Sequence, residues 1–193
     1  APVAIKKRVE LLKHNDVRID DYFWLNDREN PEVIEYLNQE NNYYQKSTAH
    51  TKDFQEQLFL EMKARIKEDD TSVPYFYNGY FYITRFETNK GYPIYARRKA
   101  SMDAPEEILF NCNDMAEGES FFNLSGVSIT LDNKFASFAI DNQGRRLYNI
   151  GVKNLETGEI LTDVIENATG NCVWANDNKT LFYSRQDEIT LRP

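Results

Sequence analysis

The sequence contains few of the residues on which metal and redox chemistry depend. It has two cysteines, Cys112 and Cys172, and two histidines, His14 and His50, and none of them has the spacing of a metal site or a redox pair. We therefore expect no metal and no cofactor. The cysteines are expected to be small buried hydrophobic residues in a reducing compartment, and a disulfide between them is the alternative.

Recognisable catalytic motifs are also absent. The sequence has no G-x-S-x-G turn for a serine nucleophile and no glycine-rich phosphate-binding loop. The chain therefore cannot supply a complete Ser-His-Asp triad, and we predict no catalytic residue in it. Ser120, Ser125 and Ser137 are expected to be ordinary turn or strand residues.

Long hydrophobic runs and excess positive charge are missing as well. No apolar run approaches the roughly 20 residues that span a bilayer, and residues 1–8 lack the apolar segment of a signal peptide. Lys and Arg number 23 against 31 Asp and Glu, which gives a net charge of −8 and no concentrated basic face for phosphates. We expect a soluble, cytoplasmic protein that binds neither nucleic acid nor membranes.

Residues 1–70 are expected to form a helical segment. Asn30 is a candidate N-cap before Pro31, and apolar residues at helical spacing predict a helix over Pro31–Lys46. After a polar break, Thr51 is expected to cap a second helix. The apolar stripe of this second helix recurs every four residues, at Phe54, Leu58, Met62 and Ile66.

From Val73 onward the apolar pattern becomes that of strands. The chain has 12 Tyr and 12 Phe, which is typical of β-structure. Tyr75–Tyr77 and Tyr80–Ile83 flank Asn78-Gly79, a pair that suits a two-residue hairpin turn. Further strands are expected at Tyr92–Lys99, Glu106–Phe110, Val127–Thr130, Phe135–Ile140, Leu147–Leu155, Glu159–Asp163, Cys172–Ala175 and Thr180–Arg185.

An internal repeat indicates how these strands are arranged. Val127–Phe138 resembles Cys172–Tyr183, and both read as a strand, an Asp-Asn-Lys turn and a strand, 45 residues apart. Such a period, with about four strands per unit, is typical of a β-propeller blade. We expect antiparallel blades at 71–125, 126–170 and 171–193, the last one incomplete. Because a propeller closes only with roughly four to eight blades, we expect a piece of a longer protein that self-associates through unpaired edges.

Charged pairs are the remaining candidates for a site. Arg145-Arg146 follows an expected strand and could face a cavity or a domain interface, where each arginine would bind a carboxylate with two hydrogen bonds. A solvated hairpin end is the alternative for this pair. The adjacent acids Asp20-Asp21 and Glu106-Glu107 could act in acid–base chemistry, but we expect them to be solvated.

Several stretches carry a resemblance to a known family. Arg18–Asp27, followed by Pro31–Val33 and Tyr36–Asn41, resembles the N-terminal signature of the prolyl oligopeptidase family of serine peptidases. Four further segments are similar to its oligopeptidase B subfamily, namely Arg65–Tyr75, Tyr92–Lys99, Asn154–Gly158 and Val173–Asp177. The resemblance implies a mainly β protein with an N-terminal helical segment and the first two to three four-stranded blades of a seven-bladed propeller.

The same resemblance implies a function. A C-terminal α/β-hydrolase domain, absent from this chain, would carry the catalytic triad and hydrolyse short peptides after Arg or Lys without a cofactor. The propeller would restrict substrate size and dock that domain, residues 1–70 would pack on it, and Arg145 and Arg146 would face the interface or the substrate. This N-terminal fragment would be inactive alone. The alternative is a non-enzymatic interaction module that binds a partner along an exposed sheet edge.

Overall fold

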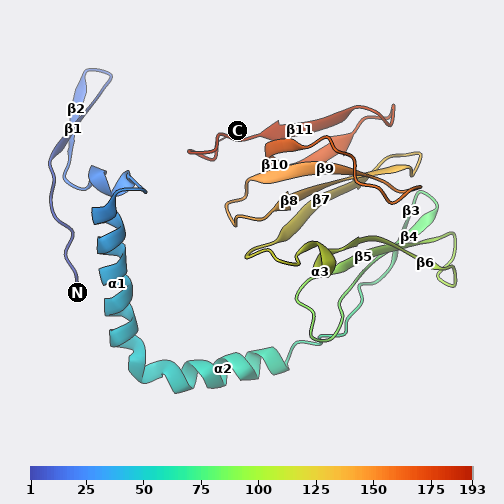
Figure 1. Ribbon diagram of the computed structural model, residues 1–193, viewed down its shortest axis with the longest axis horizontal. Coiled ribbons are helices and arrows are strands. Elements are labelled where there is room, and N and C mark those ends of the chain that lie inside the picture. The colour runs from blue at the N-terminus through green and yellow to red at the C-terminus, as the bar shows by residue number, and fades with distance from the viewer. Residues whose placement is uncertain (193) are drawn as a thin grey trace. The chain divides into compact units, whose positions relative to one another are not determined.

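The computed structural model describes residues 1–192, and its contacts separate Ala1–Ile66 from a second unit that begins at Lys67. The first unit holds a hairpin and helices, and the second holds two antiparallel sheets (Figure 1). The expected boundary after residue 70 and the expected blade boundaries stay predictions.

A β-hairpin precedes the helices of the first unit. Strands β1 (Val9–Lys13) and β2 (Asp16–Asp20) pair around His14-Asn15, both of which have positive φ. A short 3-10 helix, η1 (Phe23–Asn26), follows. The expectation of a helical segment over residues 1–70 is therefore wrong for its first part, where β1 and β2 form a hairpin. Polar and apolar residues alternate along β2 with the two-residue period of a strand.

The two longer helices form where their apolar periodicity predicts them. Helix α1 (Pro31–Thr48) begins as expected, since the Asn30 side chain accepts a hydrogen bond from the backbone N–H of Glu32 at 3.0 Å. A 3-10 turn, η2 (Ala49–Thr51), leads into α2 (Lys52–Ala64). Thr51 occupies the expected N-cap position, but its side chain accepts no capping hydrogen bond from the backbone of α2. The chain enters α2 through this helical turn, and the Thr51 hydroxyl donates instead to the carbonyl of Thr48.

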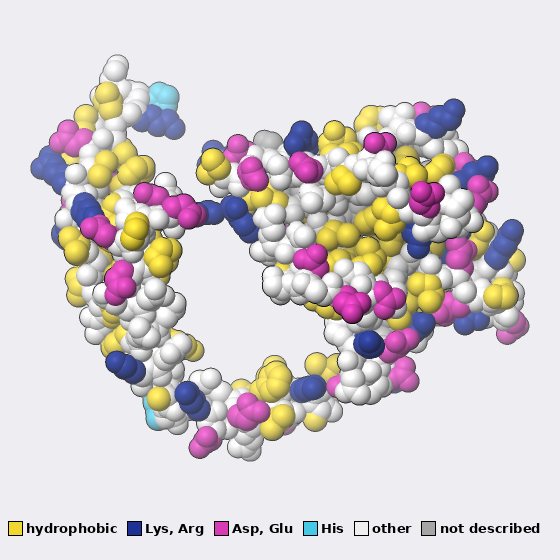
Figure 2. Space-filling model, viewed as in Figure 1, with side chains coloured by type: hydrophobic (Ala, Val, Ile, Leu, Met, Phe, Trp, Pro, Cys, Tyr) yellow, Lys and Arg dark blue, Asp and Glu magenta, His cyan; other side chains and the backbone are white. Residues whose placement is uncertain are grey.

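Both helices leave most of their apolar residues exposed. Val33 is the one buried residue of α1, and α2 has none. Figure 2 shows hydrophobic side chains at the surface along the helical segments. The exposed apolar residues include Ile34, Leu37, Phe54, Leu58, Phe59 and Met62. Within residues 1–192, no helix has the length and apolar character needed to cross a membrane.

The first sheet confirms the hairpin predicted at Asn78-Gly79. Its strands are paired in chain order and are β3 (Tyr75–Tyr77), β4 (Tyr80–Arg85), β5 (Ile94–Lys99) and β6 (Glu106–Asn111). The turn residues Asn78 and Gly79 have φ of +47° and +85°, which suits a tight turn between twisted strands.

A short helix, α3 (Cys112–Met115), leads into the second sheet. Its strands are also neighbours in chain order and are β7 (Asn123–Ile129), β8 (Phe135–Asp141), β9 (Tyr148–Asn154), β10 (Ile165–Trp174) and β11 (Leu181–Arg185). The strand expected at Glu159–Asp163 is wrong. Only Ile160 bridges to β9, and the place beside β9 is taken from Ile165 onward by β10.

The internal repeat is confirmed as two strand–turn–strand units. The turns between β7 and β8 and between β10 and β11 carry Asn133 and Asn178, with φ of +62° and +58°. The ladder between β10 and β11 shifts register between Ala168 and Cys172, and Ala168 pairs with both β9 and β11. One core cluster joins the two sheets and consists of Tyr82, Leu109, Phe110, Ala136 and Phe138.

Candidate functional site

The two arginines that the sequence singles out lie in the loop between β8 and β9. Asp141, buried at the end of β8, organises this loop. Its Oδ1 accepts hydrogen bonds from the backbone N–H groups of Gln143 and Gly144. Its Oδ2 accepts one from the backbone N–H of Arg146 at 2.7 Å. Arg146 has a φ of +58°, which the Asp141 carboxylate helps to hold. A buried carboxylate thus fixes the backbone that carries both arginines.

The loop is also tied to the segment after β11. Arg145 Nη2 donates to the carbonyl oxygen of Glu188 at 3.2 Å, and Gln186 donates from its side-chain amide to the carbonyl of Arg146. Arg145 is half-buried and Arg146 is exposed. Neither guanidinium forms an ion pair with a carboxylate of residues 1–192, so the expected carboxylate partner is not found there. Their role at an interface or toward a substrate stays a prediction.

A buried arginine that the sequence analysis did not single out lies on β5. The Arg97 side chain is 3% exposed, and its Nε and Nη2 each donate to Glu107 on β6 at 2.8 Å. Its guanidinium lies 4.0 Å from the ring centroid of Tyr80. This two-bond geometry is the strong form of an arginine–carboxylate contact, and here it joins neighbouring strands.

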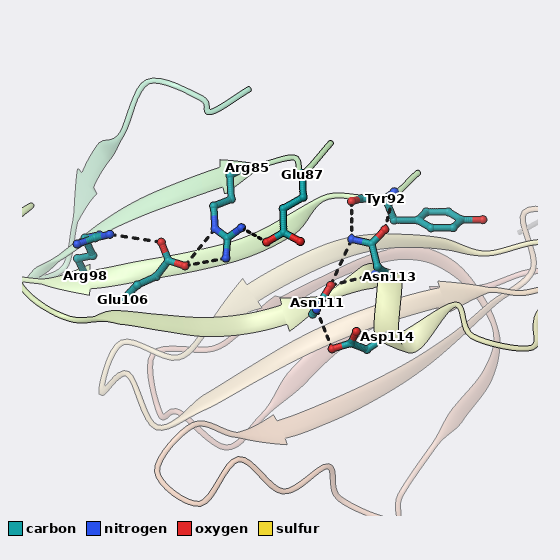
Figure 3. Close-up of polar contacts among 8 residues, drawn as sticks. All are labelled: Arg85, Glu87, Tyr92, Arg98, Glu106, Asn111, Asn113 and Asp114. Carbon is teal, nitrogen blue, oxygen red and sulfur yellow. Dashed lines mark hydrogen bonds and ion pairs between the residues drawn. The ribbon is translucent and has the colours of Figure 1, made fainter. Parts of the chain in front are cut away.

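A second ion-pair network lies beside it (Figure 3). Glu106 accepts from Arg85 at 3.1 Å and from Arg98 at 3.5 Å, and Arg85 also donates to Glu87 at 2.6 Å. The Glu87 hydrogen bond is the main cause that raises the pKa of Arg85.

The expectation that Glu106 and Glu107 are simply solvated is therefore wrong. The β5–β6 register places Arg97 opposite Glu107 and Arg98 opposite Glu106. Opposite charges in facing positions of a hairpin were the available signal. These groups neutralise one another, and their geometry indicates a structural role.

Asparagine side chains fix the start of α3. Asn113 exchanges two hydrogen bonds with the backbone of Tyr92, at 3.0 and 2.9 Å, and Asn111 donates to Asp114 at 2.7 Å (Figure 3). Asn111 also accepts from the backbone N–H of Asn113, as an N-cap does. The contacts hold the linker between the sheets against the start of β5.

Two of the cavities that lie along the sheets have mostly apolar or aromatic walls. One of about 400 Å³ lies between the first sheet and β7, and its wall includes the stacked rings of Tyr75 and Tyr82, 5.3 Å apart. Burial raises the pKa of Tyr82. The other, of about 350 Å³, has Ile150, Trp174 and Leu181 in its lining. Both are largely apolar or aromatic, and neither brings together a nucleophile and a base.

The two thiols are free and buried, as predicted from their spacing. Burial raises the pKa of Cys112 to about 11, and it also raises the pKa of Cys172. Cys172 Sγ donates to Ser137 Oγ at 3.2 Å. Protonated buried thiols are poor nucleophiles, so these groups serve packing.

Comparison with known proteins places the fold. The family model described as the prolyl oligopeptidase N-terminal β-propeller domain matches residues 2–193. The chain is 41% identical over 206 residues to dipeptidyl aminopeptidase BI of Pseudoxanthomonas mexicana and 36% identical over 182 residues to protease 2 of Moraxella lacunata. These matches cover 98% and 91% of the chain, but only 28% and 26% of the two relatives.

Solved structures agree with this assignment. Oligopeptidase B from Leishmania major superposes with a TM-score of 0.86 at 31% identity, over 99% of this chain and 29% of that one. Oligopeptidase B from Trypanosoma brucei, with covalently bound antipain in a closed form, gives 0.83 at 28% identity, over 96% of this chain and 29% of that one. The expected mainly β fold with the first part of a propeller is confirmed. The chain therefore belongs to the prolyl oligopeptidase family of serine peptidases, within its N-terminal β-propeller domain.

Proposed function

We propose that this chain forms the helical lead and the first blades of a serine oligopeptidase that hydrolyses short peptides after Arg or Lys. The match to the family model across residues 2–193, together with the likeness to two oligopeptidase B structures, carries the proposal. The chain spans about a quarter of the length of these relatives. The proposal therefore assigns the triad and its acyl-enzyme chemistry to a separate α/β-hydrolase domain.

The role assigned to the chain itself is filtering. A propeller placed over a catalytic face admits only short, flexible peptides, because a folded protein cannot pass a narrow opening. Two hydrogen-bonded sheets that share an apolar core cluster support this role, since such a wall resists opening.

We infer that the helical lead packs on the catalytic domain. Leu37 on α1 and Phe54, Leu58 and Phe59 on α2 are each more than 40% exposed. Apolar surface of this extent is typical of an interface. Arg145 and Arg146, which have no carboxylate partner within residues 1–192, are proposed to bind acidic groups of that domain or of the substrate. The two free thiols support the proposed cytoplasmic location.

A second activity has a specific observation in its favour. The relative that is 41% identical is named a dipeptidyl aminopeptidase, and such an enzyme would release dipeptides from a free N-terminus. The test uses the full-length protein with three reporter peptides, an N-blocked peptide ending in Arg, the same peptide ending in Ala, and an unblocked dipeptide. Preference for the blocked Arg peptide supports the oligopeptidase, and activity confined to the unblocked dipeptide contradicts it.

The isolated chain provides the matched control. It is expected to show no hydrolysis of any of the three reporters and no burst with an active-site titrant for serine peptidases. A stoichiometric burst from the pure chain would show that it carries its own nucleophile, and the assignment of catalysis to another domain would then be wrong.

A further inference from the structure

The turns of three hairpins, β3–β4, β7–β8 and β10–β11, contact one another through asparagine side chains. Asn78 Nδ2 donates to the carbonyl oxygen of Leu131 at 2.7 Å, and Asn133 Nδ2 donates to the carbonyl of Asn78 at 3.2 Å. The backbone N–H of Asp132 donates to Asn178 Oδ1 at 3.2 Å. All three asparagines have positive φ. The first contact pair joins the first sheet to the second.

Asn78 differs from the other two in the residue that follows it. Gly79 comes after Asn78, whereas a lysine follows both Asn133 and Asn178, and Asn78-Gly79 is the one Asn-Gly pair in the sequence. Glycine has no side chain to obstruct its backbone nitrogen, and the space around Gly79 is open, with no other atom within 4 Å of a Cβ placed there. Asn78 is also exposed.

This arrangement permits deamidation. The Gly79 backbone nitrogen attacks Cγ of Asn78 and loses its proton, the Cγ–Nδ2 bond breaks, and the nitrogen leaves as ammonia. The five-membered succinimide that forms is then opened by one water molecule at either carbonyl. The product is aspartate or isoaspartate, and no oxidant or reductant is needed.

We propose that Asn78 is a site of spontaneous deamidation and that the contact between the two sheets controls its rate. In the closed contact the departing nitrogen, Nδ2, is held by Leu131, and the Asn78 carbonyl is held by Asn133. The β3–β4 pair of Tyr77 and Tyr80 fixes the turn on either side. The side chain must leave Leu131 before its Cγ can meet the Gly79 nitrogen, so reaction requires local opening.

The product would keep the contact open. A carboxylate cannot donate to the Leu131 carbonyl and instead sets two acceptors against each other. Isoaspartate also adds a backbone atom to a two-residue turn, which disturbs the β3–β4 register. Deamidated molecules would therefore accumulate with the first and second sheets less firmly joined.

The rate test compares variants that open the contact without changing the Asn-Gly pair. Asn133→Ala removes the donor to Asn78, and Lys153→Met removes a separate link, the 2.6 Å hydrogen bond from Lys153 Nζ to the Leu109 carbonyl. The chain is incubated at mildly alkaline pH, and product at Asn78 is quantified by peptide mapping. Loss of one hydrogen bond worth about 1 kcal/mol predicts a roughly fivefold faster reaction.

The control is Asn142→Ala, which changes an exposed asparagine whose side chain makes no hydrogen bond within residues 1–192 and should leave the rate unchanged. A short unstructured peptide with the Tyr75–Tyr80 sequence gives the unprotected rate. If the wild type, both opened variants and the peptide deamidate at equal rates, the contact between the sheets does not control the rate. If the peptide reacts but no folded variant forms product, Asn78 is not a deamidation site in the folded chain.

A product mimic tests the consequence. Asn78→Asp replaces the amide group that donates to the Leu131 carbonyl. Asn178→Asp is the control, because Asn178 also has positive φ but its side chain accepts a hydrogen bond, which a carboxylate can still do. Asn78→Asp should lower the unfolding temperature of the sheets, followed by near-ultraviolet circular dichroism, by about 2–4 °C. An equal drop for Asn178→Asp would contradict the role of the Asn78 donor.

Discussion

Arg97 is buried on β5, where Glu107 and the face of the Tyr80 ring hold its guanidinium. Glu107 is 39% exposed, so water still reaches the acidic partner. The pair therefore avoids the full cost of burying two charges, and its value comes from two aligned hydrogen bonds and from packing of the arginine stem.

We expect Arg97→Met to lower the free energy of unfolding by about 2 kcal/mol, because the apolar stem is kept while Glu107 loses its partner. Urea unfolding would measure the change. Lys134→Met is the control, since its ion pair with Glu156 spans 4.0 Å and both side chains are more than half exposed. That variant should change stability by less than about 0.5 kcal/mol. Equal effects of the two variants would contradict a special role for Arg97.

Asp177 predicts how stability depends on acid. The Thr180 hydroxyl, together with backbone N–H groups, lowers the pKa of Asp177 from 3.8 to about 2. A folded-state pKa below the unfolded value contributes stability above the unfolded pKa, and that contribution is lost as the pH falls from about 4 toward 2. Asp177→Asn should therefore make the unfolding temperature fall less steeply over this range. Asp103→Asn is the control, because this carboxylate makes no hydrogen bond within residues 1–192, and it should leave the pH dependence of the unfolding temperature unchanged. An equal change in both variants would contradict the role assigned to Asp177.

At the scale of elements, strands β7 and β10 approach each other at two glycines. Trp174 Nε1 donates to the carbonyl of Ser128 at 3.1 Å, and Cys172 contacts the carbonyl of Gly126. A Cβ on Gly126, which has a φ of +61°, would lie 2.1 Å from the carbonyl oxygen of Gly170. The close approach of the two repeated units thus depends on the absence of a side chain at this position.

Gly126→Ala should cost more than about 3 kcal/mol, because the new methyl group meets backbone that cannot move aside without separating the strands. Gly118→Ala is the matched control. Gly118 also has a positive φ, +83°, but nothing lies within 4 Å of its Cβ position, so conformational strain alone predicts about 1 kcal/mol. Denaturant unfolding of both variants would separate the cost of the steric clash from the cost of backbone strain. Similar losses in the free energy of unfolding would show that the β7–β10 contact is not tight.

At the scale of the whole molecule, the two sheets end in strands that pair on one side only within the described residues. β11 pairs with β10, and β3 pairs with β4. Phe182 on β11 and Phe76 on β3 are each about 60% exposed. Unpaired edges with exposed aromatic residues recruit other strands, so we predict that the isolated chain self-associates.

Sedimentation velocity over a range of concentrations would measure this. Phe182→Lys should reduce association, because a charged side chain on an edge strand opposes strand pairing. Ile189→Lys makes the same kind of change at an exposed apolar residue outside any strand and should have little effect. A monomer at every concentration would contradict the prediction, and an equal effect of both variants would indicate association through apolar surface and not through edges.

The sequence alone was sufficient to predict those elements that depend on a few adjacent residues. Asn30 before Pro31 predicted the start of α1, Asn78-Gly79 predicted the first hairpin, and the duplicated Asp-Asn-Lys turns predicted two similar units. Each of these depends on backbone conformation and nearby hydrogen bonds, which a few adjacent residues determine. The resemblance of short motifs to a peptidase family was confirmed by a family match that extends over residues 2–193.

Only the tertiary structure decided which residues meet across those elements. The pairing of Arg97 with Glu107 depends on strand register, and the truncation of the strand expected at Glu159 depends on where β10 lies. The contact of Asn78 with Leu131 joins residues 53 positions apart. The Asn78 contact arises from packing of the two sheets, which no local pattern encodes, because the free energy that selects it is spread over the whole core.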